Sequence, residues 1–316
     1  MNKKSALLPL VGLAATLTLV VAIPHVMADA VSWEKLSNQA KQALEAKDSA
    51  KAIDLYGKAV EEARGSKLEA KFVALSLNDL AMAYNASGNK VEAEKYLKEA
   101  LSVKEAAYGK EDATLVPTLG NLGQLYKSNK EFNNAAAAYQ RAVDITQKLD
   151  GRSVKLVPLV NAQAALATEM GDDAGALEKL KQVVDLCKEN KDKGAQVIAM
   201  NNMAVVLRKQ GKTAEAEAIY KDVVALQGTT DGEGGANRGE DKDKNSAAAL
   251  TNLARVMREK GDFAGAKPLL EKAFDQLSAN ATEANLRDRI VTADNLATVS
   301  KAVSYTHLTL PTKRIV

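Results

Sequence analysis

Histidine is almost missing from this sequence of 316 residues, which contains only His25 and His307. Both lie close to the ends of the chain, so residues 31–302 contain no histidine. Imidazole is the base of Ser-His-Asp and Cys-His active sites and a frequent zinc ligand. These catalytic classes and the histidine-containing zinc sites are therefore excluded for the body of the protein.

Cysteine and aromatic residues are also scarce. Cys187 is the only cysteine, so no disulfide can form within the chain. A lone cysteine on a helix is most often a buried small apolar residue, and a reactive thiol is the alternative. Aromatic residues make up only 4% of the sequence, whereas the strong helix formers Ala, Leu, Glu and Lys are abundant. We therefore expect an all-α protein.

The N-terminus has the order of a secretory signal peptide. Lys3 and Lys4 precede an apolar run over residues 6–23, and the sequence Ala-Asp-Ala then fits cleavage after Ala30. The alternative is an uncleaved membrane anchor, because about 18 apolar residues are near the minimum that spans a bilayer. We expect residues 1–30 to be a signal peptide and the protein to be exported, periplasmic or extracellular, unless the segment stays as an anchor.

The charge of the body is balanced. The whole chain has a formal net charge of +3. Without the four basic residues of the two ends, Lys and Arg fall from 43 to 39, and without Asp29, Asp and Glu fall from 40 to 39. Residues 31–302 are therefore neutral, with both signs interspersed. We expect neither nucleic acid nor an anionic membrane surface as a partner.

Two segments of the body repeat each other. They read LNDLAMAYNASGNKVEAEKYLKEAL at 77–101 and LGNLGQLYKSNKEFNNAAAAYQRAV at 119–143, and a shift of 42 residues aligns them. The aligned pairs are Leu77 with Leu119, Leu80 with Leu122, Ala81 with Gly123, Tyr84 with Tyr126, Ala93 with Ala135, Leu97 with Tyr139 and Ala100 with Ala142. Further copies in the same frame begin near Trp33, Val160, Met200 and Leu250.

This pattern resembles the tetratricopeptide repeat, a helix–turn–helix unit with small residues where its helices cross. The resemblance covers residues 33–302 and implies an α-solenoid of stacked helix–turn–helix repeats that forms a right-handed superhelix. It places six repeats and a truncated seventh within residues 31–302. Ala and Gly at the crossings allow the close approach that this packing needs. Glycines between the two helices, such as Gly88 and Gly171, are expected in the left-handed conformation.

The repeats are longer than usual for the family. Successive units are 40 to 43 residues apart, compared with about 34 in the common form. This length is similar to that of the kinesin-light-chain type, which has longer second helices and loops. The fifth and sixth units are 50 residues apart, and residues 228–246 between them are rich in Gly, Asp and Lys. That composition predicts a mobile surface loop.

The body shows no pattern of an enzyme. Residues 241–245 (DKDKN) alternate like a calcium loop, but Ser246 and Asn252 replace the glycine and glutamate that such a loop requires. The glycines of residues 232–235 lack the Lys-Ser/Thr of a phosphate loop. The many carboxylates are typical of solvated helix faces, and no pair is marked out by its spacing. We expect a non-enzymatic protein without cofactor or metal.

The last fourteen residues, VSYTHLTLPTKRIV at 303–316, differ from the repeats. A seventh unit begins at Ile290, and its first helix is expected to stop at Ala302. Terminal repeats of a solenoid normally carry a polar outer face, which this threonine-rich stretch does not supply. The back-translated stretch resembles a sequencing-library adapter. We expect residues 303–316 to be non-native and the gene to continue, and the alternative is a genuine C-terminal tail.

The concave surface of stacked repeats is the candidate binding site. In the resembling family this surface is lined by the first helix of each unit. The residues at the lining positions are Asn78, Asn85, Asn121, Gln124, Lys127, Asn161, Asn201, Asn202, Arg208, Asn252, Arg255, Arg258 and Asn295. Asparagine offers a donor and an acceptor, so a row of them would hold the main chain of an extended peptide. The alternative is that these amides bond the neighbouring helix and order the stack.

Arg208, Arg255 and Arg258 are suited to a carboxylate, although any one of them would also fit a solvated face. The clamp of lysines and asparagines found in chaperone-binding members of the family is not matched. We expect an exported scaffold that binds a protein or peptide. The alternative is a recruitment or assembly module of a longer cell-envelope protein with an enzymatic C-terminal part. Self-association through the incomplete seventh repeat also stays open.

Overall fold

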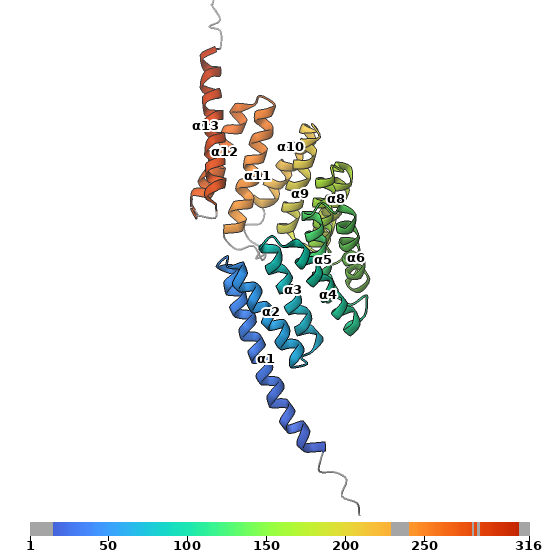
Figure 1. Cartoon of the computed structure of the whole chain (residues 1–316). Helices are drawn as coiled ribbons and strands as arrows, with labels where there is room; N and C mark the ends of the chain where they lie inside the picture. The colour runs from blue at the N-terminus through green and yellow to red at the C-terminus, as the bar shows by residue number, and fades with distance from the viewer. Residues whose placement is uncertain (1–14, 229–239, 280, 283–284, 310–316) are drawn as a thin grey trace, which may run out of the picture. The chain divides into compact units, whose positions relative to one another are not determined.

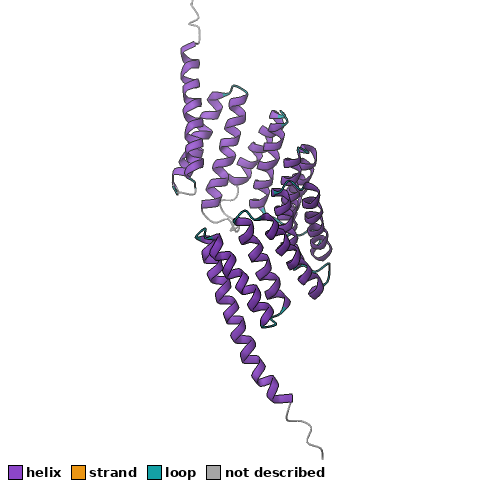
Figure 2. Cartoon of the chain, in the orientation of Figure 1, coloured by secondary structure: helices purple, strands orange, loops and turns teal. Residues whose placement is uncertain are grey.

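The computed structural model describes residues 15–228, 240–279, 281–282 and 285–309, with side chains for 30–226, 246–279, 281–282 and 285–304. These residues form thirteen helices joined by short turns (Figures 1 and 2). The helices are α1 (Ala15–Glu45), α2 (Ser49–Gly65), α3 (Ala70–Ala86), α4 (Lys90–Tyr108), α5 (Leu115–Ser128), α6 (Phe132–Asp150), α7 (Leu156–Met170), α8 (Asp173–Glu189), α9 (Lys193–Lys209), α10 (Thr213–Gly228), α11 (Glu240–Glu259), α12 (Phe263–Ala279) and α13 (Leu286–Thr309).

The chain divides into two compact units, unit 1 (Met1–Ile145) and unit 2 (Thr146–Val316), and the boundary falls within α6. In each unit a helix packs against the next one along the chain, from α1 to α5 and from α7 to α13. In unit 2 the odd-numbered helices also contact one another, α7 with α9, α9 with α11 and α11 with α13. This sequential packing of helix pairs confirms the all-α class and the α-solenoid of stacked repeats. The odd-numbered helices are the first helices of the repeats.

Small residues lie buried at the helix crossings, as the repeat pattern predicts. A fully buried alanine occurs at the same position in the second helix of each of the six repeats: Ala52, Ala93, Ala135, Ala176, Ala216 and Ala266. In the third repeat the first helix carries Gly123, and a methyl group there would overlap the ring of Tyr139. The close approach of the helices therefore depends on these residues being small.

The turn between the two helices of each repeat contains one residue in the left-handed backbone conformation. Gly88 and Gly171 have φ values of 85° and 78°, as expected. Lys47 and Lys130 adopt the same conformation at the matching places, with φ of 61° and 62°. In four of the six repeats the second helix begins after an Asp or Asn whose side chain accepts a backbone N–H. Asp172, for example, accepts from the backbone N–H of Gly175 at 2.9 Å.

Two boundaries differ from the sequence predictions. Of the loop expected over residues 228–246, residues 229–239 lie outside the described residues, and residues 240–246 are helical, because α11 begins at Glu240. The acidic residues at its start favour the positive end of a helix, which explains the early beginning. At the other end, α13 does not stop at Ala302 but runs to Thr309. Val303 continues the apolar spacing and packs with Leu296 and Val299. Residues 241–245, which alternate like a calcium loop, are helical, and their side chains lie outside the described residues.

At the N-terminus, α1 runs from Ala15 through Ala30, the predicted cleavage point, to Glu45. Within the part of the chain that the structure describes, no helix combines the length and the apolar character needed to cross a membrane.

Candidate functional site

All thirteen candidate lining residues lie on first helices, with Asn85 on α3, Gln124 on α5 and Asn295 on α13. Unit 1 contains Asn78 on α3 with Asn121 and Lys127 on α5. Unit 2 contains Asn161 on α7, Asn201, Asn202 and Arg208 on α9, and Asn252, Arg255 and Arg258 on α11. Each unit therefore has its own set.

In unit 1 the predicted asparagines bond each other. The Nδ2 of Asn121 donates to the Oδ1 of Asn78 at 3.0 Å, and this bond joins α5 to α3. Both side chains are half-buried, as is Lys127 in the last turn of α5. For Asn78 and Asn121, the contact with the neighbouring helix is the one that the stack-ordering alternative describes.

The half-buried carboxyl of Asp79, the residue after Asn78, was not predicted from the sequence. Burial raises the pKa of Asp79 from its ordinary 3.8 to about 6, although a hydrogen bond with Asn78 and the charges of Lys104 and Lys41 lower it. The nearby Tyr56 has its pKa raised to about 12, by burial first and then by the charges of Asp79 and Glu45. An aspartate on an amphipathic helix is normally solvated. Periodicity alone therefore gave no signal of this cluster.

Lys104, on α4, closes the cluster from the other side. Its Nζ donates to the Thr114 carbonyl and to the Thr118 Oγ1, both at 2.8 Å. Burial lowers the pKa of Lys104, and the charge of Asp79 opposes this shift. The polar groups of unit 1 thus satisfy one another across α3, α4 and α5.

In unit 2 two of the three predicted arginines connect neighbouring first helices. Arg208 on α9 forms an ion pair with Glu259 on α11, with 2.9 Å between Nη1 and Oε1. Arg258 on α11 donates from Nη1 to the Oδ1 of Asn295 on α13 at 2.9 Å. Arg255 lies one turn before Arg258, is half-buried, and has no hydrogen bond or ion pair with any described residue.

Eight buried side-chain polar atoms of unit 2 have no hydrogen-bond partner among the described residues, and three of them bear on the candidate site. They are the Oδ1 of Asn161, the Oδ1 of Asn201 and the hydroxyl of Tyr220. Tyr220 is 0% exposed. Burial raises the pKa of Tyr220, whereas the charges of Arg208 and Arg255 lower it and that of Glu259 raises it. Both arginines therefore lie near enough to act electrostatically on this hydroxyl.

The corresponding tyrosine of unit 1 has a hydrogen-bond acceptor. Tyr139 occupies the position of Tyr220, sixteen residues after the small residue of the first helix. Its hydroxyl donates to the Oε1 of Gln124 at 3.2 Å. The position of Gln124 is taken in unit 2 by Val205. Unit 2 therefore lacks the acceptor that unit 1 supplies.

Three adjacent first helices of unit 2 carry matching stripes, spaced i, i+4 and i+7 so that they lie on one side of each helix. The stripes are Ile198, Asn202 and Val205 on α9, Ala248, Asn252 and Arg255 on α11, and Val291, Asn295 and Thr298 on α13. We call these nine residues the unit 2 face. Ile198, Val205 and Val291 are 41%, 42% and 41% exposed. The face therefore combines exposed apolar side chains with amides and one unpaired arginine.

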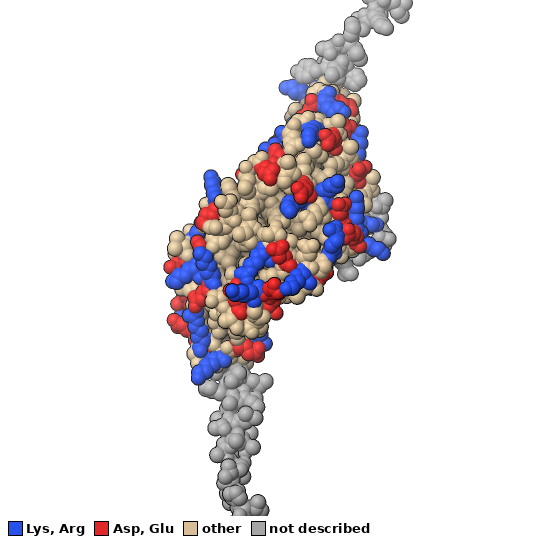
Figure 3. All heavy atoms as spheres, turned by 90° about the vertical axis from the view of Figure 1, so that its right-hand side faces the viewer, with Lys and Arg blue, Asp and Glu red and all other residues tan. Residues whose placement is uncertain are grey.

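Other reactive or charged groups have structural roles. Cys187 is fully buried, as expected for a small apolar residue, and burial raises the pKa of its thiol to about 11. In the described residues no cluster of three or more His, Cys, Asp or Glu side chains is placed to hold a metal. On the surface drawn in Figure 3, basic and acidic side chains are interspersed rather than gathered by sign.

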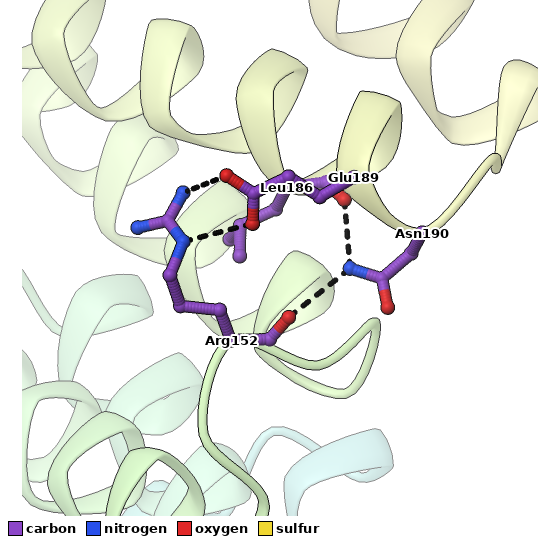
Figure 4. Close-up of polar contacts among 4 residues, drawn as sticks. All are labelled: Arg152, Leu186, Glu189 and Asn190. Carbon is purple, nitrogen blue, oxygen red and sulfur yellow. Dashed lines mark hydrogen bonds and ion pairs between the residues drawn. The ribbon is translucent and has the colours of Figure 1, made fainter.

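Arg152 forms the best-developed ion pair away from the first helices (Figure 4). Its Nε and Nη2 donate to the two carboxylate oxygens of Glu189 at 2.8 and 2.9 Å. The Nδ2 of Asn190 donates to the carbonyls of Arg152 and Leu186 at 3.1 and 2.8 Å. These contacts fasten the segment before α7 to the end of α8.

Comparisons with known proteins agree with this architecture. Family models described as tetratricopeptide repeat match residues 72–148, 156–227 and 246–275. No curated protein matches the chain in sequence.

Among solved structures, BtubC (BKLC) from P. vanneervenii is similar, with a TM-score of 0.57 and 19% identity, covering 72% of this chain and 97% of its own. A kinesin light chain structure with nearly identical repeats from Podosopora anserina has a TM-score of 0.52 and 20% identity, covering 66% and 96%. A signal transduction ATPase with a repeat sensor from Pyrococcus horikoshii has a TM-score of 0.57 and 12% identity, covering 88% and 40%. At these identities the likeness is one of fold alone, and it includes proteins of the kinesin-light-chain type.

Proposed function

Because the chain belongs to the tetratricopeptide repeat family, we propose that it is an exported, non-enzymatic scaffold that binds a protein or an extended peptide. The binding surface is the unit 2 face. Stacked helical repeats present extended surfaces of this kind, and their common use is to hold another polypeptide. The fold by itself fixes no partner, so the proposal depends on the side chains of the face.

The observation that carries the proposal is the pair of free amides on α9 and α11. Asn202 is exposed and Asn252 is half-buried, and neither has a hydrogen-bond partner among the described residues. They occupy the same register on helices that contact each other. Each amide can donate to a peptide carbonyl and accept from a peptide N–H, whatever the side chains of that peptide are.

Apolar exposure supports the same assignment. Ile198 and Val205 stand one turn before and one turn after Asn202, and each is more than two-fifths exposed. A single exposed apolar residue has no special meaning, but apolar residues that flank a free amide in a regular register give a peptide both burial and hydrogen bonds.

Export is supported by the N-terminal order of residues: two lysines, the apolar run of residues 6–23 and the Ala-Asp-Ala segment that ends at Ala30. N-terminal sequencing of the protein from its native host tests this part. A mature chain that begins at Val31 is the expected result, and an intact Met1 in the cell envelope would instead identify an anchor.

Peptide binding is tested with a display library of random peptides panned against the purified full chain. We expect one family of related peptides to be enriched, and the affinity of a synthetic member to fall about tenfold or more in the double variant Asn202→Ala and Asn252→Ala. Circular dichroism should show unchanged helicity. Asn133→Ala is the control, because Asn133 is an exposed amide on the second helix α6 and does not belong to unit 2. Unchanged affinity in the double variant would show that the face is assigned wrongly, and failure to enrich any peptide would reject peptide binding.

A further inference from the structure

One side of α13 is exposed where the corresponding side of α11 is covered. In α11, Ala247 and Ala254 are 0% and 1% exposed, and they pack on α12, the second helix of the same repeat. A shift of 43 residues places Ile290 and Ala297 at the same positions of α13. Ile290 is 53% exposed, and Ala297 is also exposed. Among the described residues, the side of α13 on which a second helix would pack is therefore left open.

This side of α13 carries apolar side chains together with two opposite charges. Leu286, Ile290, Asp294, Ala297 and Lys301 follow one another at spacings of three or four residues, which places them on one side of the helix. We call these five residues the α13 face, and all of them are exposed. Neither Asp294 nor Lys301 forms an ion pair with a described residue. The face therefore has both apolar surface and unpaired charges to offer to another molecule.

The charges make the α13 face complementary to a second copy of itself. Asp294 and Lys301 lie three residues before and four residues after Ala297. When two copies of α13 run antiparallel and cross beside Ala297, Asp294 of each copy faces Lys301 of the other, and two ion pairs form. A parallel arrangement would instead place Asp294 against Asp294 and Lys301 against Lys301, which is repulsive. The charge pattern therefore selects the antiparallel pairing.

The length of α13 suits the same arrangement. The point midway between Asp294 and Lys301 is also the midpoint of the 24-residue helix Leu286–Thr309, so two antiparallel copies overlap along the whole helix, roughly 36 Å. Ala297 lies at this midpoint, and its small side chain permits the close approach of two helices. A two-fold contact of this kind uses the same surface on both copies and closes without further growth.

We propose that two copies of the chain associate through the α13 face as an antiparallel pair, with Asp294 of each copy paired to Lys301 of the other and with Ile290 and Ala297 buried between the helices. Burial of the apolar side chains supplies the affinity, whereas the ion pairs set the orientation. A contact between two helices is small, so we expect a reversible dimer with a micromolar dissociation constant. All five residues of the face precede residue 303, so these side chains lie outside the stretch predicted to be non-native.

Sedimentation equilibrium of the purified full chain without peptide, from about 1 to about 300 µM, tests the proposal. We expect an equilibrium between monomer and dimer. Ile290→Asp should weaken the dimer about tenfold or more, because it places a charge in the apolar contact. Val91→Asp is the matched control, since Val91 is 77% exposed on α4 in unit 1, and it should leave the dimer unchanged.

Exchange of the two charges tests the antiparallel register. Asp294→Lys and Lys301→Asp, each made alone, place like charges opposite each other at both ends of the contact and should weaken the dimer about tenfold. The double variant restores both ion pairs with their direction reversed and should bring the dissociation constant back to within about threefold of the wild type. Higher salt should reduce the effect of each single change. Circular dichroism confirms that each variant is folded.

Three results would overturn the proposal. A chain that stays monomeric at every concentration does not form the dimer. A dimer that Ile290→Asp leaves intact uses another surface, and single charge variants that are not rescued in the double variant rule out the antiparallel register. The proposed function is tested separately, because Asn202 and Asn252 lie on α9 and α11, outside the α13 face. Peptide binding and dimer formation can therefore fail independently of each other.

Discussion

The first helices of unit 1 and unit 2 carry polar residues in the same register but with different surroundings. In unit 1, Asn121 donates to Asn78 and Tyr139 donates to Gln124. In unit 2 the side-chain oxygen of Asn201 and the hydroxyl of Tyr220 are buried without a partner among the described residues. The side chains of Asn121 and Tyr139 therefore join neighbouring helices in unit 1, whereas those of Asn201 and Tyr220 in unit 2 each keep a buried oxygen without a partner among the described residues.

The difference indicates which positions stabilise the fold. A typical internal hydrogen bond contributes about 1 kcal/mol, whereas a buried polar group without a partner costs about 1–3 kcal/mol. Polar side chains in unit 2 therefore reduce its stability unless another molecule supplies the missing partners. Residues retained against stability are those for which function is the better explanation. The unit 2 face is assigned to binding because its Asn202 and Asn252 have no partner among the described residues, whereas the equivalent Asn121 of unit 1 bonds Asn78.

The largest expected effect concerns the buried carboxyl of unit 1. Asp79→Asn should raise the free energy of unfolding at neutral pH. The change of the Asp79 pKa from 3.8 to about 6 corresponds to roughly 3 kcal/mol at most. Lys104 would lose a favourable charge, so we expect a gain of about 1–2 kcal/mol. Urea unfolding of both proteins at neutral pH measures it.

The pH dependence of stability tests independently whether ionised Asp79 destabilises the folded protein. The folded state binds the Asp79 proton more tightly than the unfolded chain, so the wild type loses stability as the pH rises from about 4 to about 6. The variant should lack this loss, and the difference between the two proteins should shrink as the solution is acidified. The control is Asn202→Asp in unit 2, which places a carboxylate at the matching but exposed position and should change stability little. An Asp79→Asn protein less stable than the wild type at neutral pH would contradict the desolvation account.

Alanine substitutions of matching asparagines in the two units should have different, intermediate effects on the free energy of unfolding. Asn78 and Asn201 both lie three residues before the buried alanine of their first helix. Asn78→Ala leaves Asn121 without its partner and should lower the free energy of unfolding by about 1–2 kcal/mol. Asn201→Ala removes an amide whose buried oxygen has no partner and should leave the free energy of unfolding unchanged or raise it by up to about 1 kcal/mol. Thermal or urea unfolding of the two single variants makes the comparison, and equal losses would mean that the open amide of unit 2 is structurally used.

Much of the fold was predictable because the repeat is a packing rule. Ala, Gly and Leu recur where helices cross, so residues such as Ala81 and Gly123 locate the helix pairs without any structural information. The left-handed turn could be predicted where it is glycine, as at Gly88. At Lys130 the same turn is forced by the packing on both sides, which no local preference reveals.

The sequence predicted where the candidate residues lie but not which of them have hydrogen-bond partners. The repeat register placed the candidate residues on first helices, yet it could not tell that Asn121 bonds Asn78 while Asn202 stays free. That outcome depends on side-chain distances between neighbouring repeats. Asp79 was missed for the same reason, because Lys41, Tyr56 and Lys104, which interact with it electrostatically, lie on α1, α2 and α4 rather than on its own helix.

The smallest expected effect, and the most selective, comes from removing one hydroxyl in each unit. Tyr139→Phe loses a hydrogen bond to Gln124 and should lower the free energy of unfolding by about 0.5–1.5 kcal/mol. Tyr220→Phe loses no bond and should leave stability unchanged or raise it by up to about 1 kcal/mol. Urea unfolding without peptide measures both. A loss of stability in Tyr220→Phe would show that the hydroxyl already has a partner in the free protein.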